Sequence, residues 1–401
     1  MRVLVVHNRY STRVPSGENL AVDDEVRWLR ESGVDVVRHE VSNDEIVTAG
    51  PLGRVREGVN AVWSVPARRR FLAALDDSAP DVVHVHNLFP LLSGSVPAAA
   101  RRRGLPVVWT VHNRRLRCVA GGHFRDGAPC RQCRPGWRIP GIVHRCYAGS
   151  TAASALVSAS SSLFRVTARR DGVVPVAISR HMAAWLGSSA GFDAERVRVK
   201  YNAVDAPRVP PADPASRRRF VFAGRLALYK GVGLLLDAWR QVPAALDVTL
   251  RIAGDGDAAD RVRAATSDDP RIEWVGHVAP GDVGEHLDAA RAVLVPSLWD
   301  EPFGRVAAEA FAHGRPVITT GRGGLAEIVD GATGWVTGAS PAALAAVIVD
   351  AARSDDAVRQ RGDAGRRRHA ERFSPQATTE ALRRIYREAC GDHAPAGKAR
   401  A

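Results

Sequence analysis

Short apolar runs alternate along the chain with longer segments in which apolar residues recur every three or four positions. The short runs predict buried strands and the periodic segments predict amphipathic helices. Residues Asn19–Glu31 show the helical pattern, with Val22, Val26 and Leu29 on one face. Strands that alternate with helices are typical of βαβ units, so the predicted fold class is α/β with parallel sheets.

The strands form two series, separated by a segment with four prolines in the eight positions from Pro207 to Pro214. Such a segment neither continues a helix nor joins a central strand, so we interpret it as a linker. The predicted strands are Val3–His7, Val34–Val37, Val82–His86, Val107–Val111, Pro175–Ile178 and Val197–Tyr201 in the first series, and Phe220–Gly224, Val248–Ala253, Ile272–Val275, Ala292–Pro296 and Pro316–Thr319 in the second. The helices predicted in the second series are Gly233–Val242, Val283–Ala289, Val306–Ala312 and Pro341–Ala352.

Two Rossmann-like domains facing across a cleft are therefore expected, residues 1–206 and residues 207–374. The last helix, Pro375–Cys390, is predicted to pack back on the first domain, and residues 391–401 are predicted to form a disordered tail. Ligands bind beyond the carboxyl ends of the strands in open α/β sheets. Functional residues are therefore expected at those ends.

Composition and charge restrict the class of protein and the kinds of partner that the sequence allows. The chain has 401 residues, of which 45% are hydrophobic and 25% charged, as in globular proteins. Of its net charge of +13, the first 206 residues carry most, with 29 Lys and Arg against 18 Asp and Glu. This excess indicates either codon bias toward arginine or an anionic partner such as a phosphorylated acceptor or a membrane surface. A nucleic-acid partner is disfavoured, because the cations are scattered and few aromatic residues lie between them.

The N-terminus reads as a strand rather than a signal peptide, and no apolar run is long enough to span a bilayer. We expect a cytoplasmic protein, with peripheral contact to the inner membrane surface left open.

The segment Leu298–Ala310 follows an apolar strand and combines a turn with the start of a helix. Pro302 and Gly304 favour the turn, and the helix N-terminus beyond them offers amides to an anion such as a diphosphate. Glu301 and Glu309 are placed to accept sugar or ribose hydroxyls. Two surface glutamates on a capping loop are the alternative for this segment alone.

Three further segments follow strands of the second series. Gly224, Arg225 and Lys230 follow the first of them and offer two cations for a diphosphate beside a backbone that a ligand can approach. A glycine turn at residues 254–256 is followed by Trp274–Val278, where His277 and Val278 could hold a flat base. Residues 321–329 form a glycine loop that opens a helix.

These segments resemble the donor half of retaining glycosyltransferases of family four, which have the GT-B fold. The resemblance covers essentially the whole chain. It implies that Arg225 and Lys230 hold the diphosphate of a nucleotide sugar, that Glu309 binds the ribose and that Glu301 binds the transferred sugar. It also implies that the backbone amides of four residues contact sugar and phosphate: Phe303, Gly304, Arg305 and Val306.

The first domain, which binds the acceptor in this family, resembles it too. Gly17 lies in Pro15–Asn19, where the family has a glycine-rich loop near the diphosphate, although this sequence has a single glycine there. His112 with Asn113 ends a strand where the family places a histidine near the donor sugar; a structural histidine is the alternative. The resemblance marks His112, Glu301, Arg225 and Lys230 as catalytic and implies front-face transfer without a catalytic metal. It names no donor; a UDP-sugar is the first candidate and GDP-mannose the next.

Four cysteines lie within 29 residues: Cys118, Cys130, Cys133 and Cys146. Their C-x11-C-x2-C-x12-C spacing suits a tetrahedral structural zinc in a polar segment that would pack poorly alone. Reduced loop cysteines and disulfides remain alternatives.

The prediction is thus a retaining hexosyltransferase that acts on a glycan, lipid-linked or natural-product acceptor. Two alternatives stay open. One is a sugar-nucleotide epimerase or phosphorylase of the same fold, and the other is a non-catalytic, zinc-stabilised binding protein.

Overall fold

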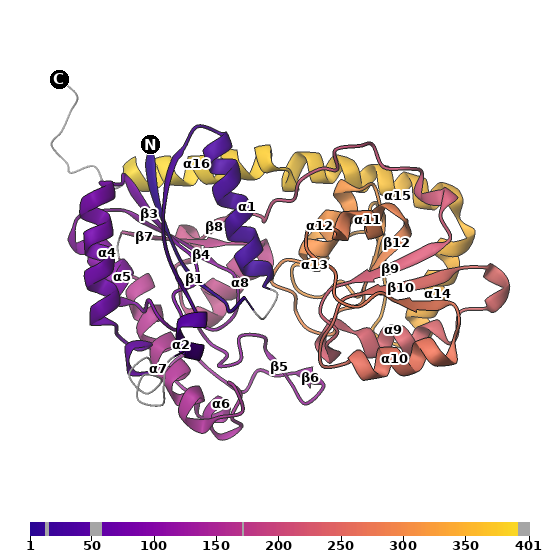
Figure 1. Cartoon of the computed structure of the whole chain (residues 1–401), viewed down its shortest axis with the longest axis horizontal. Coiled ribbons are helices and arrows are strands. Elements are labelled where there is room, and N and C mark those ends of the chain that lie inside the picture. Colours follow the sequence, from indigo (N-terminus) through magenta and orange to yellow (C-terminus); the bar gives the residue numbers. More distant parts are fainter. Residues whose placement is uncertain (13–15, 49–57, 171, 392–401) are drawn as a thin grey trace. The chain divides into compact units, whose positions relative to one another are not determined.

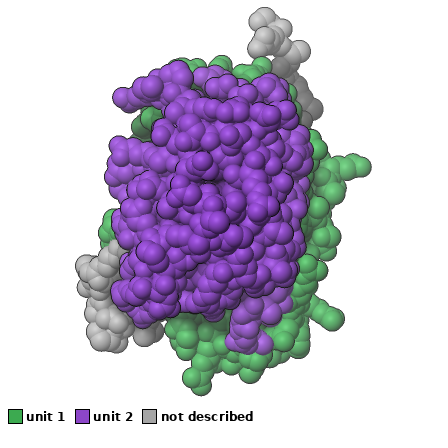
Figure 2. Space-filling model, turned by 90° about the vertical axis from the view of Figure 1, so that its right-hand side faces the viewer, with its two compact units in different colours: residues 1–123, 131–201, 378–401 green, residues 124–130, 202–377 purple. Residues whose placement is uncertain are grey.

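The computed structural model describes residues 1–12, 16–48, 58–170 and 172–391. The chain forms two compact units. Unit 1 comprises residues 1–123, 131–201 and 378 onward, and unit 2 comprises residues 124–130 and 202–377 (Figure 2). Among the described residues, no helix combines the length and apolar character needed to cross a membrane.

Unit 1 is built on a six-stranded parallel sheet in the order β2-β1-β3-β4-β7-β8 (Figure 1). One face is covered by α1 and α16, whose apolar residues pack on the strands in a single core with Val3, Val5, Val108 and Val176. Helices α4, α5 and α7 pack on one another in a second layer. The strands are β1 (Arg2–Arg9), β2 (Asp35–Ser42), β3 (Val82–Val85), β4 (Val107–Val111), β7 (Val173–Ala177) and β8 (Arg198–Val199).

The helices of unit 1 are α1 (Gly17–Glu31), α2 (Asp44–Thr48), α4 (Val65–Ser78), α5 (Ser95–Arg102), α6 (Ile139–Val143), α7 (Thr151–Ala168), α8 (Arg180–Trp185) and α16 (Pro375–Gly391), whose residues from Thr378 on belong to this unit. Helix α16 contributes Leu382, Ile385, Tyr386 and Ala389 to the unit 1 core. A short hairpin, β5 (Phe124–Arg125) and β6 (Ala128–Pro129), lies within the cysteine-containing segment.

Unit 2 has a second six-stranded parallel sheet, in the order β11-β10-β9-β12-β13-β14. Helices α9, α10 and α14 share one core with its strands, while α12 packs against α15. The strands are β9 (Arg219–Ala223), β10 (Thr249–Ala253), β11 (Ile272–Trp274), β12 (Ala290–Val295), β13 (Val317–Thr319) and β14 (Gly334–Val336), and the helices are α9 (Val232–Trp239), α10 (Ala259–Asp268), α11 (Val283–Asp288), α12 (Arg305–Ala312), α13 (Leu325–Ile328), α14 (Pro341–Arg353) and α15 (Asp355–Arg368).

The prediction of two parallel α/β units is confirmed, and every predicted strand is present, Val107–Val111 with the predicted ends and the others with shifted ends. Strand β2 runs on to Ser42, through polar residues that sit on an edge strand and form ion pairs there. Strand β3 ends at Val85, so His86 begins a loop rather than ending the strand. Strand β14 was not predicted. Gly391 ends α16, and the rest of the predicted tail lies outside the described residues.

The predicted linker begins after the point where the units divide. The chain passes from unit 1 to unit 2 between Tyr201 and Asn202. Val204 is fixed within unit 2, because its amide donates to the Phe373 carbonyl at 2.9 Å and its carbonyl lies 2.8 Å from Nε2 of His369. The proline-rich residues follow this anchor and lead into a 3₁₀ turn at Pro214–Ser216.

Candidate active site

The strand order of unit 2 reverses at β9, which has β10 on one side and β12 on the other. Loops that leave the carboxyl ends of such neighbouring strands diverge and leave room for a ligand between them. The segment Gly224–Lys230 follows β9 and the segment Pro296–Gly304 follows β12. The two strongest sequence motifs therefore flank the position where a ligand is expected.

The loop after β9 reaches the loop after β12 through glycine-dependent packing. Gly231 has φ +79°, and a Cβ at this position would lie 1.9 Å from the Pro296 carbonyl oxygen, so no other residue fits. The Leu298 amide donates to the Tyr229 carbonyl at 2.8 Å. Lys230 is thereby held beside the residues that follow β12.

Lys230 and Glu301 form an ion pair with a distance of 2.7 Å between Nζ and Oε1. The Ser297 hydroxyl donates to the same oxygen at 2.7 Å. Burial acts to raise the pKa of Glu301, but the Lys230 charge and hydrogen bonds from Lys230, Ser297 and Trp299 outweigh it, so the pKa lies below the usual value. Glu301 is thus an ionised carboxylate although only 4% of its surface is exposed.

Several donors hold the Glu301 carboxylate. Oε1 accepts from both Lys230 and Ser297, and the Trp299 side chain is a further hydrogen-bond donor beside this carboxyl group. Because each oxygen of an ionised carboxylate can accept more than one hydrogen bond, Glu301 can also accept from the hydroxyls of a ligand.

The predicted glycine loop at residues 321–324 supports the Glu301 backbone. Glu301 pairs with Gly323 in a parallel bridge, and the Gly324 amide donates to the Glu301 carbonyl at 2.7 Å. A Cβ on Gly323, which has φ +68°, would lie 2.4 Å from that carbonyl oxygen. This loop therefore supports the backbone of the candidate ligand-binding segment.

Helix α12 begins at Arg305, with Gly304 as its N-cap at φ +107° and no capping hydrogen bond from a side chain. The free backbone amides at its N-terminus have a geometry that suits the binding of an anion. Glu309, five residues on from the cap, pairs with Arg305 through Nε and Oε1 at 2.8 Å. The sequence predicted only the backbone of Arg305 as a contact, and its side chain turns out to position Glu309. Phe303 is buried, and Val306 lies in the first turn.

Arg225 is exposed, and no hydrogen bond or ion pair joins its side chain to another described residue. Gly224 before it has φ +143°, with open space where a Cβ would stand. His277, which is exposed, and Val278 follow β11, two strands from β9. Their loop is tied to the turn after β10, because the Gly254 amide donates to the Gly276 carbonyl at 2.7 Å.

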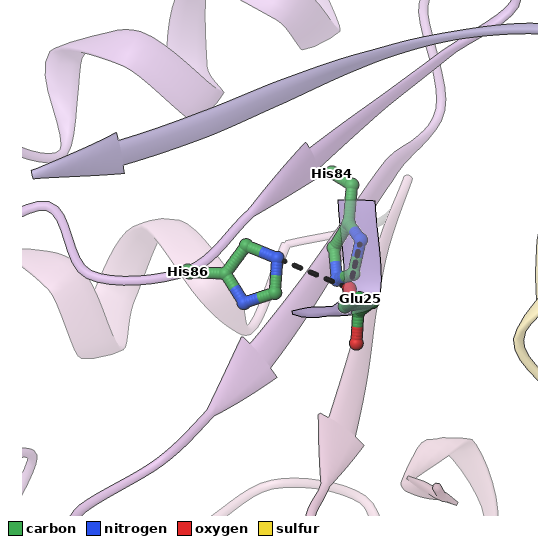
Figure 3. Close-up of side chains that lie close together, drawn as sticks. All are labelled: Glu25, His84 and His86. Carbon is green, nitrogen blue, oxygen red and sulfur yellow. Dashed lines mark ion pairs between the residues drawn. The ribbon is translucent and has the colours of Figure 1, made fainter. Parts of the chain in front are cut away.

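Unit 1 places a different group of side chains at its own point of strand reversal, between β1 and β3. His112 follows β4 and His86 follows β3; Nε2 of His112 lies 3.0 Å from Nδ1 of His86, and the rings are stacked. Glu25 of α1 lies 3.3 Å from both His84 and His86 (Figure 3). Lys200 forms an ion pair with the second oxygen of Glu25.

Burial keeps three of these histidines uncharged. Burial is the largest cause that lowers the pKa of His84 and of His112 well below 6.5. Burial also lowers the pKa of His7 to about 3. By contrast, the Lys200 charge holds the pKa of Glu25 far below its usual value, although burial opposes it.

Glu25, His84 and His86 have ligand atoms within 4.8 Å of one another, as a metal site would. Two of the three side chains are already engaged, however. His84 contacts Thr110 at 2.8 Å and Tyr386 at 2.7 Å through its two nitrogens, and Lys200 neutralises Glu25. We interpret the cluster as a hydrogen-bonded network.

A pocket opens beside this network, lined among others by Glu18, His86, His112, Asn113 and Arg115. Burial raises the pKa of Glu18, which the Arg115 charge opposes. Gly17 starts α1 and is exposed, with Ser16 as the N-cap; Pro15 of the predicted loop lies outside the described residues. The sequence predicted His112 here, but not Glu18, Glu25, His86, Arg115 or Lys200.

The four clustered cysteines lie in the segment between β4 and α7. His123 donates its amide to Sγ of Cys118 at 3.4 Å, Cys146 bonds through its amide to Gly141, and Cys133 lies under α6. None of the described cysteines forms a disulfide. Among the described residues, no three of the four sulfurs lie within 4.8 Å of one another. Zinc binding, with Cys130 as the fourth ligand, stays a prediction.

Comparison with known proteins identifies the family. Residues 19–208 match the family described as Glycosyltransferase Family 4, and residues 217–354 match Glycosyl transferases group 1. D-inositol 3-phosphate glycosyltransferase of Geodermatophilus obscurus is 31% identical over 426 residues, covering 95% of this chain and 87% of the relative. The chain belongs to glycosyltransferase family 4.

Other similarities agree with this assignment. Alpha-maltose-1-phosphate synthase of Mycolicibacterium smegmatis is 28% identical over 97% of this chain and 99% of its own length. The crystal structure of Anabaena HepE in complex with UDP superposes with a TM-score of 0.68 at 18% identity, covering 97% of this chain and all of HepE. This family 4 glycosyltransferase therefore has the GT-B fold and transfers sugar from a nucleotide sugar, which decides against the epimerase, phosphorylase and binding-protein alternatives.

Proposed function

We propose that this glycosyltransferase takes a hexose from a UDP-sugar and transfers it to an acceptor hydroxyl with retention of anomeric configuration. The observation that carries the proposal is the Lys230–Glu301 pair at the point of strand reversal. Lys230 lies in the same loop as the exposed Arg225. UDP-glucose is the first donor to test, because Anabaena HepE has been crystallised with UDP-glucose. GDP-mannose is the second.

The diphosphate would lie between the loops after β9 and β12. Arg225 offers a planar guanidinium for two phosphate oxygens, and Lys230 adds a point charge. The uncapped N-terminus of α12 supplies amides and a partial positive charge. These groups would stabilise the charge that develops on the leaving diphosphate, which needs no catalytic metal.

The two glutamates would bind the rest of the donor. Glu309, oriented by Arg305, would accept hydrogen bonds from the ribose hydroxyls. Glu301 would accept from hydroxyls of the transferred sugar. His277 and Val278 would flank the base.

Unit 1 would supply His112 at the transferred sugar and the pocket beside it for the acceptor. Buried and uncharged, His112 can exchange hydrogen bonds with a sugar hydroxyl without adding a positive charge. The acceptor class stays open between a glycan, a lipid-linked sugar and a natural product, as does contact with an anionic membrane.

The cysteine segment would bind one structural zinc through its four sulfurs. Elemental analysis of the purified chain tests this: one zinc per chain is expected. A content well below one, unchanged in a variant with all four cysteines replaced by serine, would exclude the site.

Turnover of the donor with water as acceptor tests the main proposal without knowledge of the natural acceptor. The chain is incubated separately with UDP-glucose and GDP-mannose, and proton NMR follows which anomer of the free sugar appears first. The α anomer of glucose, with EDTA without effect, is expected. Release of the β anomer first would contradict retention, and turnover of GDP-mannose alone would overturn the donor.

A further inference from the structure

The hydrogen bond between His86 and His112 links a proposed active-site histidine to a buried carboxylate that no sequence motif marks. His112 lines the pocket with part of its surface exposed. Its Nε2 is engaged by Nδ1 of His86 at 3.0 Å, and its Nδ1 makes no hydrogen bond with a described residue. The nitrogen that a ligand can reach is therefore Nδ1.

The charge of Glu25 affects which ring nitrogen of His86 carries a proton. An ionised carboxylate only accepts hydrogen bonds, and Lys200 keeps Glu25 ionised. Oε1 of Glu25 lies 3.3 Å from Nε2 of His86, so the carboxylate favours a ring proton on Nε2, and in the neutral form of the imidazole this is the only ring proton. Nδ1 of His86 is then unprotonated and can only accept.

The proton position on His86 in turn determines the proton position on His112, its hydrogen-bond partner. If Nδ1 of His86 accepts, Nε2 of His112 must donate, and the neutral His112 ring carries no proton on Nδ1. Which ring nitrogen of a histidine is protonated is set by the hydrogen bond that the other nitrogen makes.

We propose that Glu25 and His86 are positioning residues that hold His112 as the Nε2-protonated tautomer, so that its Nδ1 accepts a hydrogen bond from a hydroxyl of the bound sugar. The inference rests on the role proposed above for His112. Lys200 contributes to this arrangement, because its ion pair balances the charge of Glu25.

The other titratable groups near His112 do not compete for the two ring nitrogens. His7 pairs with Asn19 at 3.0 Å. His84 is occupied by Thr110 and Tyr386, as described above. Glu18, also in the pocket, accepts hydrogen bonds from Tyr10 and Asn113.

Nitrogen NMR of the full chain labelled with ¹⁵N-histidine tests the tautomer directly, because protonated and unprotonated ring nitrogens have separate shifts. The signals of His112 are assigned by their loss in His112→Gln. Between pH 6 and 8 the wild type is expected to show His112 with the proton on Nε2 alone. A proton on Nδ1, or on both nitrogens, would overturn the proposal without any variant of the network.

Two variants test the relay. In His86→Phe the ring can still stack on His112 but accepts nothing, so the His112 signals should shift to a mixture of both tautomers. His39→Gln, which changes another histidine of the same sheet, is the matched control and should leave them unchanged. Unaltered His112 signals in a folded His86→Phe chain would contradict the relay.

Turnover of UDP-glucose separates this inference from the proposed function. If His112→Gln turns over UDP-glucose at the wild-type rate while the tautomer is as expected, the relay stands and the role of His112 at the sugar fails. If His112→Gln loses turnover but His112 carries its proton on Nδ1, the role stands and the relay fails.

Discussion

The two units place their polar clusters at equivalent points of similar sheets but with opposite electrostatics. In unit 2, charged groups lie in the loops beside the point of strand reversal: Arg225 is exposed, and Lys230 pairs with the ionised Glu301. In unit 1, the charges of Glu25 and Lys200 are buried, and His112 alone of that network's imidazoles lies part-exposed. The contrast suggests that one cluster binds charge while the other fixes the direction of hydrogen bonds.

The lysines emphasise the contrast. In a chain where almost every cation is arginine, the lysines within the described residues are Lys200 and Lys230, and each pairs with a glutamate of one cluster. An ammonium is a compact charge that fits where a guanidinium fork does not. The same kind of ion pair thus lies in two settings. Lys200–Glu25 is buried in unit 1, where we propose that it takes part in positioning, and Lys230–Glu301 lies in unit 2, where we propose that it binds the donor.

The largest effect is expected from Lys230→Ala. Loss of one charge that stabilises the leaving group should cut donor turnover by about 10²–10³-fold. It also leaves the buried Glu301 carboxylate without its cation, so the melting temperature should fall. Turnover of UDP-glucose and thermal melts measure both effects.

The double variant Lys230→Ala with Glu301→Gln separates the two effects. Its melting temperature should recover toward the wild type while turnover stays lost. Arg240→Ala, an exposed cation of the same unit, is the control. A Lys230→Ala chain with wild-type turnover would refute the assignment of unit 2 as the charge-binding cluster.

A smaller effect is expected from Gly323→Ala. The added Cβ would clash with the Glu301 carbonyl at a residue with positive φ, so the loop that supports Glu301 has to move. Strain of this kind costs about 1–3 kcal/mol and should lower turnover by about tenfold. Gly331→Ala, where the added Cβ meets nothing within 4 Å, is the matched control. Equal turnover in both variants would show that Glu301 does not depend on the glycine loop.

The smallest effect concerns the buried imidazoles of unit 1. Burial lowers the pKa of His7 from its usual value of 6.5 to about 3 in the folded chain, so below pH 6.5 the unfolded chain binds a proton that the folded chain does not bind. Stability should therefore fall as the pH drops, by about 1.4 kcal/mol per pH unit for this histidine. Denaturant unfolding between pH 7.5 and 5.5 measures the slope. His7→Asn should make it shallower, and an unchanged slope would contradict a buried, uncharged His7.

The two clusters also differ in how far the sequence predicts them. The unit 2 residues lie in short segments directly after strands, where Gly224, Gly304 and the glycine loop mark the turns, so their positions followed from local pattern. The pairing of Lys230 with Glu301 did not, because it depends on how two loops meet. The roles that the family resemblance implies for these residues are still predictions.

Apart from His112, the unit 1 network was not predicted, because its members come from α1, from β3, from the loops after β3 and β4, and from the residue after β8. Two signals were present. Glu25 lies on the apolar face of α1 between Val22 and Leu29, where an unpaired charge would be costly. His84 and His86 are two residues apart and so point to the same side of their strand. Neither signal identifies Lys200, which is 175 residues from Glu25 in the chain.

Calorimetric titration of UDP into three chains tests the division between the clusters most directly. We predict that the wild type and His112→Gln bind UDP with dissociation constants within about twofold of each other, and that Lys230→Ala binds it at least about tenfold more weakly. Undiminished binding by Lys230→Ala, together with loss of binding in His112→Gln, would contradict the assignment of charge recognition to unit 2.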